Sequence, residues 1–230
     1  MALTEAQQNR EADYQLKFAV IGNAGVGKST IVCNFAHHII SEDYNATIGM
    51  DFVSRQFIGA NNKLINIQLW DTAGSERFKS LCLGAFKAAI CIILVYDITN
   101  KQSFSDVVKW MQDIEDNCID DVEIILIGNK CDLNHERVIS FEQGRKFADD
   151  RGCMFRETSA LRQDSVDGIF EDLANTIMRK FKEGVYSKYT NGNFGIVAKR
   201  ADGGDVTKDI NLAVGAGEGP GKRRACCKPS

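Results

Sequence analysis

Residues 22–29 carry the clearest chemical signal in the chain. They follow the pattern G-x-x-x-x-G-K-S, which is typical of a loop that binds phosphate groups. Glycines let backbone N–H groups approach phosphate oxygens closely, the Lys28 ammonium would reach the β- and γ-phosphates, and the Ser29 hydroxyl would ligate Mg²⁺. The residues expected to hold the nucleotide phosphates are Gly22, Asn23, Ala24, Gly25, Val26, Gly27, Lys28, Ser29 and Thr30.

A second pattern, N-K-x-D at residues 129–132, predicts recognition of guanine rather than adenine. The Asp132 carboxylate can accept two hydrogen bonds, which matches the N1–H and the exocyclic amine of guanine, whereas adenine has no such donor pair on that edge. Asn129 would fix the loop and Lys130 would cover the base. The later segment Thr158-Ser159-Ala160 would offer a backbone N–H to the guanine O6, so Ser159 and Ala160 join the expected base site.

The stretch between these two patterns predicts segments that respond to the γ-phosphate. Asp71 stands at the end of an apolar run, where it would contact Mg²⁺ through water, and the N–H of Gly74 would meet the γ-phosphate. The Thr47 hydroxyl would ligate the same Mg²⁺ only while that phosphate is present. The expected metal set is therefore Ser29, Thr47 and Asp71, and loss of the γ-phosphate would release both segments.

Strands and helices must alternate along the chain to position these loops. Helix starts are marked by capping patterns at residues 103–106 and 140–143, and an apolar helical face follows Ser165. We expect an α/β fold with a mostly parallel six-stranded sheet, one antiparallel edge strand and helices on both faces. The expected strands cover residues 16–21, 52–58, 64–70, 89–96, 124–127 and 154–155.

These motifs, in this order and spacing, resemble the Ras superfamily of small GTPases, and residues 48–52 and 70–78 resemble its Rab branch. The resemblance covers about residues 14–182 and implies the P-loop small-GTPase fold, with GTP or GDP and Mg²⁺ as ligands. It also implies a guanine nucleotide exchange factor, a GTPase-activating protein, a GDP-dissociation inhibitor or escort protein, and trafficking effectors as partners. The effector surface implied by the resemblance contains Ile48, Phe52, Trp70 and Phe86.

The chain departs from the family pattern at Ser75, where the family has a Gln that orients the attacking water. A serine side chain is too short for that role, so we expect slow intrinsic GTP hydrolysis unless an activating protein supplies the missing group. An alternative hypothesis is a GTP-held membrane adaptor with negligible hydrolysis. An ATP-dependent kinase is a weaker alternative, because the N-K-x-D pattern argues against it. The expected catalytic residues are Lys28, Thr47, Gly74 and Ser75.

The 230 residues predict three regions: a flexible N-terminus at 1–13, a GTPase domain at 14–183, and a flexible Gly-rich tail at 184–230. The tail carries a net charge of +4, which leaves −7 for residues 1–183 and argues against nucleic acid as a partner. No apolar run is long enough to span a membrane. The basic residues 222–224 precede Cys226 and Cys227, the expected geranylgeranylation sites. We therefore expect the cytoplasmic face of an intracellular membrane, with cycling through the cytosol.

Overall fold

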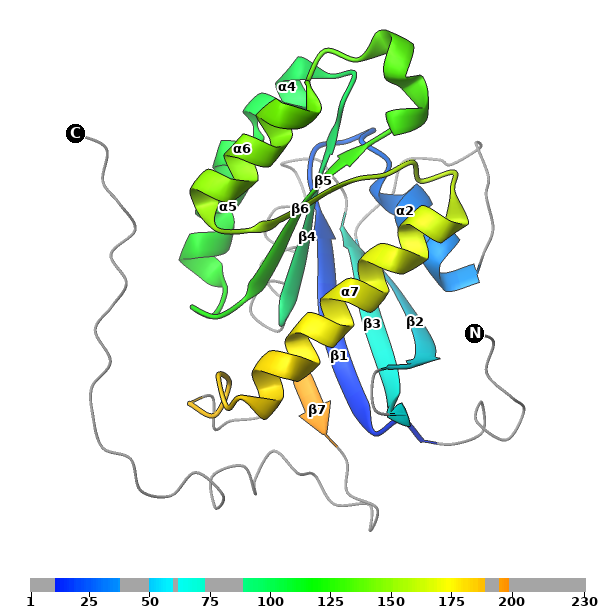
Figure 1. Cartoon of the computed structure of the whole chain (residues 1–230), viewed down its shortest axis with the longest axis vertical. Helices are drawn as coiled ribbons and strands as arrows, with labels where there is room; N and C mark the ends of the chain where they lie inside the picture. Colours follow the sequence, from blue (N-terminus) through cyan, green and yellow to red (C-terminus); the bar gives the residue numbers. More distant parts are fainter. Residues whose placement is uncertain (1–10, 38–49, 60–61, 73–88, 189–194, 199–230) are drawn as a thin grey trace, which may run out of the picture.

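The computed structural model describes residues 11–37, 50–59, 62–72, 89–188 and 195–198 (Figure 1). Strands and helices alternate through most of this length, as the sequence predicts. The strands are β1 (Tyr14–Ile21), β2 (Met50–Ile58), β3 (Leu64–Thr72), β4 (Cys91–Asp97), β5 (Glu123–Asn129), β6 (Met154–Glu157) and β7 (Ile196–Ala198). The helices are α2 (Lys28–His37), α4 (Lys101–Ser105), α5 (Val107–Asn117), α6 (Phe141–Arg151) and α7 (Gln163–Lys182), with a 3₁₀ segment at Cys131–Glu136.

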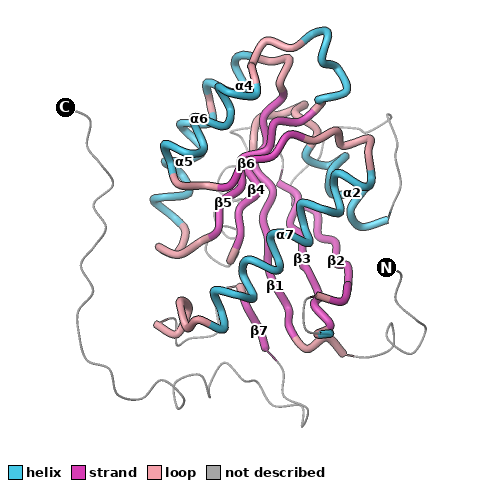
Figure 2. Tube along the Cα trace, in the orientation of Figure 1, coloured by secondary structure: helices cyan, strands magenta, loops and turns pink. Residues whose placement is uncertain are grey.

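The strands form one twisted sheet, in the order β2-β3-β1-β4-β5-β6 (Figure 2). Strands β3, β1, β4, β5 and β6 are parallel, while β2 pairs antiparallel with β3 and forms one edge. This arrangement confirms the expected α/β architecture and the expected hairpin. Parallel strands bring their carboxyl ends to the same edge of the sheet, so the loops after β1, β5 and β6 lie together with the end of β3.

Helices cover both faces of the sheet (Figure 1). On one face α2 and α7 pack against β1, β3, β4 and β5, around side chains such as Phe18, Phe35 and Phe170. On the other face α5 and α6 pack against β1, β4 and β5, around Ile92, Tyr96 and Met111. Strand β4 is buried along its whole length because both faces are covered, which explains its continuous apolar sequence. Among the described helices, none combines the length and apolar character that crossing a bilayer requires.

One of the two expected capping patterns is confirmed. The Ser140 hydroxyl accepts a hydrogen bond from the Gln143 N–H at 3.1 Å, and the Gln143 side chain accepts one from the Ser140 N–H at 2.8 Å. The helix start predicted from residues 103–106 is wrong. The N-cap residue is Asn100, and α4 begins directly after it. Ser103 is thereby enclosed within α4, where its hydroxyl donates to the Asn100 carbonyl at 2.8 Å.

The seventh strand, β7, extends the sheet beyond the six expected strands. It pairs antiparallel with the start of β1, from Tyr14 opposite Ala198 to Leu16 opposite Ile196. The neighbouring strand β4 first pairs with β1 at Phe18, so the earlier residues of β1 have an open side that β7 fills.

The segment before β7 also joins the folded part of the chain. The Tyr186 side chain is only 2% exposed, and its hydroxyl donates to the Glu123 carboxylate at 3.4 Å. Residues 184–188 and 195–198 therefore belong with the domain, although the sequence analysis places them in a flexible tail. The sequence obscures this because three apolar residues in a Gly-rich stretch give no clear periodicity.

Candidate functional site

The phosphate loop connects β1 to α2 with a backbone that requires glycine. Gly22, Gly25 and Gly27 have φ angles of +136°, +77° and +93°, in the region that L side chains rarely adopt. A Cβ atom on Gly22 would overlap the backbone carbonyl oxygen of Val95, and one on Gly27 would overlap the side-chain amide of Asn129. The loop thus presents a cradle of bare backbone at the N-terminus of α2, which is the geometry that binds phosphate.

Lys28 and Ser29 are the first two residues of α2 and directly follow the glycine loop. The Lys28 side chain is almost fully buried, and its ammonium donates to the Asn23 carbonyl oxygen at 2.8 Å. The Ser29 hydroxyl donates to the Asp71 carboxylate at 2.5 Å, across the gap between α2 and the end of β3. These two oxygens come from residues that the sequence analysis places in one metal site. A hydroxyl and a carboxylate suit Mg²⁺, which prefers hard oxygen ligands, so this pair fits the expected ion.

Trp110 of α5 and Asp106, the residue that precedes this helix, hold the phosphate loop through hydrogen bonds to Asn23. The Trp110 indole N–H donates to the Asn23 side-chain oxygen at 2.8 Å, and the Asn23 amide donates to Asp106 at 2.8 Å. Hydrogen bonds from Lys109, Asn23 and Gln102 lower the pKa of the Asp106 carboxyl to about 2. The sequence analysis missed Trp110 and Asp106, because no local spacing connects them to a loop more than eighty residues earlier.

Asn129 joins the phosphate loop to the predicted base loop. Its buried side-chain amide donates to the Val26 carbonyl at 2.8 Å, and its side-chain oxygen accepts from the Ala160 N–H at 2.9 Å. This agrees with the loop-fixing role predicted for Asn129. The sequence analysis offers a backbone N–H of the segment 158–160 to guanine O6, and one of these donors, the Ala160 N–H, is already engaged with Asn129 in this structure.

Lys130 and Asp132 follow Asn129 at the same edge of the sheet. Lys130 adopts a left-handed backbone with φ of +67°, and its ammonium pairs with the buried Asp97 carboxylate at 2.7 Å. This pairing fixes the position of the lysine side chain. Asp132 is exposed on the 3₁₀ segment, where its carboxylate is accessible to a ligand.

A buried asparagine that the sequence analysis missed also holds the base loop. The Asn34 amide, on α2, donates to the Ala160 carbonyl at 2.8 Å. Thr158 and Ser159 are buried as well, and the Thr158 hydroxyl contacts the Ser165 hydroxyl at the start of α7. No motif marks Asn34, since an isolated asparagine in a helix gives no sequence signal.

Two of the four predicted effector-surface residues lie in the described part of the chain. Phe52 on β2 and Trp70 on β3 are directly opposite each other in the hairpin, with ring centroids 5.0 Å apart. Phe52 is 44% exposed, so its ring is accessible to a partner. The predicted site residues that lie outside the described residues are Thr47, Ile48, Gly74, Ser75, Phe86, Cys226 and Cys227.

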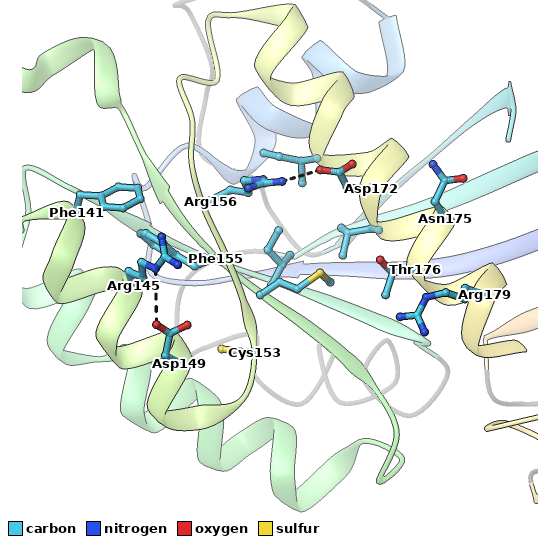
Figure 3. Close-up of a pocket in the computed structure, with 14 residues that line it drawn as sticks. Phe141, Arg145, Asp149, Cys153, Phe155, Arg156, Asp172, Asn175, Thr176 and Arg179 are labelled. Carbon is cyan, nitrogen blue, oxygen red and sulfur yellow. Dashed lines mark hydrogen bonds and ion pairs between the residues drawn. The ribbon is translucent and has the colours of Figure 1, made fainter. Parts of the chain in front are cut away.

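A cavity of about 610 Å³ lies away from these loops, beside the edge strand β6 and between α6 and α7 (Figure 3). Its charged side chains are engaged in ion pairs, Arg145 with Asp149 at 3.7 Å and Arg156 with Asp172 at 2.9 Å. It contains none of the glycine, lysine or asparagine groups described above. The candidate nucleotide site is therefore the loop cluster at the carboxyl ends of the strands.

Comparisons with known proteins give results that agree with this site. The model of the Ras family matches residues 17–179. The chain is 42% identical to Ras-related protein Rab-8B of Pongo abelii over 168 residues, which cover 73% of this chain and 81% of that protein. It is 41% identical to Ras-related protein Rab-10 of Caenorhabditis elegans over 174 residues, covering 76% and 86%. It is 40% identical to Rab-8B of Bos taurus over 185 residues, covering 80% and 89%.

Proposed function

Because the chain belongs to the Rab branch of the Ras superfamily of small GTPases, we propose that it is a membrane-anchored GTP/GDP switch that recruits effectors in vesicle trafficking. One observation carries the nucleotide assignment. The Asn129 side chain bonds to both Val26 and Ala160, so the phosphate loop and the base loop form one connected site. The distance between the two loops is then set by a buried side chain, which favours a ligand that has both phosphates and a base.

Each group of the site has a proposed task in binding. The N–H groups of the glycine loop and the positive end of the α2 dipole would bind phosphate oxygens, with Lys28 at the β- and γ-phosphates. Ser29, Thr47 and Asp71 would hold Mg²⁺, which neutralises charge on the phosphate oxygens when it is bound. Asp132 would select guanine through its N1–H and exocyclic amine. The support for this assignment is the 2.5 Å contact of Ser29 with Asp71 and the exposure of Asp132.

We propose that GTP hydrolysis is slow in the isolated protein because Ser75 replaces the water-orienting glutamine. Lys28 and the Gly74 N–H would still stabilise charge on the transferring phosphoryl group. An activating protein that supplies the missing group would restore turnover. The second candidate, a GTP-held adaptor, is favoured by the same residue and differs in requiring no acceleration by any activating protein.

Single-turnover GTP hydrolysis by the full chain tests this assignment. Wild type, Ser75→Gln and the control Ser75→Ala are compared with and without a Rab-type activating protein. We expect Ser75→Gln to hydrolyse GTP about tenfold faster than wild type or faster still, and Ser75→Ala to match wild type. Rescue of wild type by the activator supports a regulated GTPase, whereas a wild type that stays slow supports the adaptor. Fast hydrolysis by wild type alone contradicts the proposed role of Ser75.

The proposed partners follow from family membership. They are a guanine nucleotide exchange factor, a GTPase-activating protein, a GDP-dissociation inhibitor or escort protein, and trafficking effectors. We assign effector binding to the surface around Phe52 and Trp70, together with Ile48 and Phe86, because exposed aromatic side chains commonly anchor interfaces. Geranylgeranyl groups on Cys226 and Cys227 would hold the protein on the cytoplasmic face of an intracellular membrane, and extraction would return it to the cytosol.

A further inference from the structure

We propose that Asn34 is a positioning residue for the guanine base, acting through the backbone of Ala160. This inference rests on the proposed function, since it concerns the same nucleotide site. It assigns a task to a residue of α2 that has no place in the phosphate-binding or guanine-binding motifs. The backbone of Ala160 is hydrogen-bonded to the side chains of both Asn34 and Asn129.

The geometry forms a clamp made of two asparagines. The Asn34 amide donates to the Ala160 carbonyl at 2.8 Å, while the Ala160 N–H donates to the Asn129 side-chain oxygen at 2.9 Å. Both backbone polar groups of Ala160 are therefore bonded to side chains from distant parts of the sequence. Two such bonds fix the orientation of the peptide planes on either side of Ala160, which belongs to the segment assigned to guanine O6.

The burial of Asn34 argues against a role in packing alone. The residue is 0% exposed, and its side-chain oxygen has no hydrogen-bond donor within the described part of the chain. A buried amide with one unsatisfied half is less favourable than an apolar side chain of the same volume. The hydrogen bond that the Asn34 amide donates to the Ala160 carbonyl explains why a polar side chain occupies this position.

Helix α2 gives the clamp a rigid base. Asn34 lies on the same helix as Lys28 and Ser29, so the element that carries the phosphate-binding side chains also holds the base loop. The helix is fixed at its far end, where the Phe35 ring stacks on Phe170 with centroids 3.8 Å apart. The Arg55 guanidinium also donates to the Phe35 carbonyl at 2.8 Å. A helix anchored in this way resists the movement that would take Asn34 away from Ala160.

The consequence for the ligand is specific to one atom of the base. Without the Asn34 donor, the loop loses one of its two side-chain restraints at Ala160, although Asn129 still holds the Ala160 N–H, and the contact of the loop with guanine O6 weakens. The contact of Asp132 with the N1–H and amine edge is unaffected, because Asp132 belongs to a different segment. Loss of Asn34 should therefore speed the release of nucleotides that have a good acceptor at C6, and have little effect on those that do not.

The experiment compares the dissociation of GDP and of 6-thioguanosine diphosphate from the full chain with Mg²⁺. The sulfur analogue keeps the N1–H and the amine of guanine, and replaces O6 by a weak acceptor. Asn34→Leu keeps the branching and the number of heavy atoms of the asparagine side chain, although it is bulkier, and it has no donor. We expect this variant to release GDP about tenfold faster than wild type, the effect of one hydrogen bond, and the analogue less than about threefold faster.

Val32→Ala is the matched control, because Val32 is a buried residue of the same helix with a purely apolar side chain. Its packing loss should speed the release of both nucleotides by the same factor. Should Asn34→Leu not yield folded protein, Asn34→Ala provides the same comparison with less volume to accommodate.

Three results overturn the inference. The first is an Asn34→Leu variant that speeds the release of both nucleotides equally, and the second is one that changes neither rate. The third is a wild type that releases GDP and the analogue at the same rate, which overturns the assignment of the base loop to O6 along with the role of Asn34. The first two leave the guanine-nucleotide assignment itself intact, so failure of the inference and failure of the proposed function give different results.

Discussion

At the scale of single residues, the site depends on residues that lie in direct contact with one another, so that substituting one displaces its neighbour. Gly27 lies against the Asn129 amide, and Asn129 holds both the phosphate loop and the base loop. Asn23 is held by Trp110 and Asp106, and its carbonyl holds the Lys28 ammonium. The phosphate-binding groups are therefore positioned by polar contacts formed within the protein.

Gly27→Ala should weaken GDP binding sharply. Its φ of +93° is strained for alanine, and the added Cβ atom would displace the Asn129 amide. Strain of this kind costs about 1–3 kcal/mol, so we expect the dissociation constant for GDP to rise by about tenfold to a hundredfold. Isothermal titration calorimetry measures this dissociation constant.

The matched control for Gly27→Ala is Gly152→Ala. Gly152 also has a positive φ, of +66°, but it ends α6 and an added Cβ atom would meet nothing within 4 Å. This variant should bind GDP as wild type does, although its unfolding midpoint falls. Equal weakening of GDP binding by the two variants would contradict the role given to Gly27.

The Asp106 carboxyl predicts a pH dependence in the acid range. Its folded-state pKa is lowered from 3.8 to about 2, so the native state favours the ionised carboxylate. The stabilisation is complete above about pH 4 and is lost as the pH falls from there towards 2. Urea midpoints of wild type and Asp106→Asn should therefore differ above pH 4 and converge as the pH approaches 2. A difference that stays constant from pH 5 to 2 would exclude this role of Asp106.

At the scale of elements, strand β7 and the segment before it attach residues beyond α7 to the sheet. The burial of Tyr186 and the pairing of β7 with β1 connect residues beyond α7 to the core. The Lys180 ammonium also pairs with the Glu123 carboxylate, which the Tyr186 hydroxyl contacts. The end of α7 and the following segment are thus attached to the start of β5.

Tyr186→Ala should lower the free energy of unfolding by about 3–5 kcal/mol, because it removes a large aromatic side chain from a site that is 2% exposed. Chemical denaturation of the GDP-bound protein measures this loss. Lys188→Ala is the control, since the Lys188 side chain is 53% exposed and its 2.6 Å ion pair with Asp121 should contribute at most about 1 kcal/mol. Equal effects of the two substitutions would show that Tyr186 is not part of the core.

At the scale of the whole molecule, the candidate site and the described C-terminal strand lie at opposite ends of the sheet (Figure 1). The phosphate loop follows the carboxyl end of β1, whereas Ala198 pairs with Tyr14 at the beginning of the same strand. The last described residue, Ala198, therefore lies at the end of the sheet away from the nucleotide loops.

The opposite charges of domain and tail predict salt-sensitive membrane binding by the lipidated protein. Residues 1–183 carry −7, while the tail carries +4 and has Lys222, Arg223 and Arg224 next to the paired cysteines. Each of these cations should contribute about 1 kcal/mol near an anionic surface, so replacing one by Ala should weaken binding about fivefold. Co-sedimentation with vesicles that contain phosphatidylserine measures the effect. Neutral vesicles are the control, and equal losses on both would contradict an electrostatic contribution.

The sequence by itself determined the chemistry of the site and the class of the fold. Lys28, Ser29, Asp71, Asn129 and Asp132 are marked by local spacing, because each lies at the end of a strand, follows one or opens a helix. A parallel sheet must bring the ends of such strands together, and the structure places Ser29 against Asp71 and Val26 against Asn129 as a result. Short-range patterns are sufficient here because each strand and each loop is a continuous stretch of residues.

The tertiary structure alone decided which residues support that site. Asn34 and Trp110 have no motif, and the pattern that contains Asp106 predicted a helix cap rather than a contact with the phosphate loop. The partners of these three residues lie far along the chain, so a local pattern does not reveal the contacts. The same holds for β7, whose three residues become a strand only because β4 begins too late to pair with the start of β1. Contacts between distant segments depend on the packing of whole elements, and packing is a property that no local pattern contains.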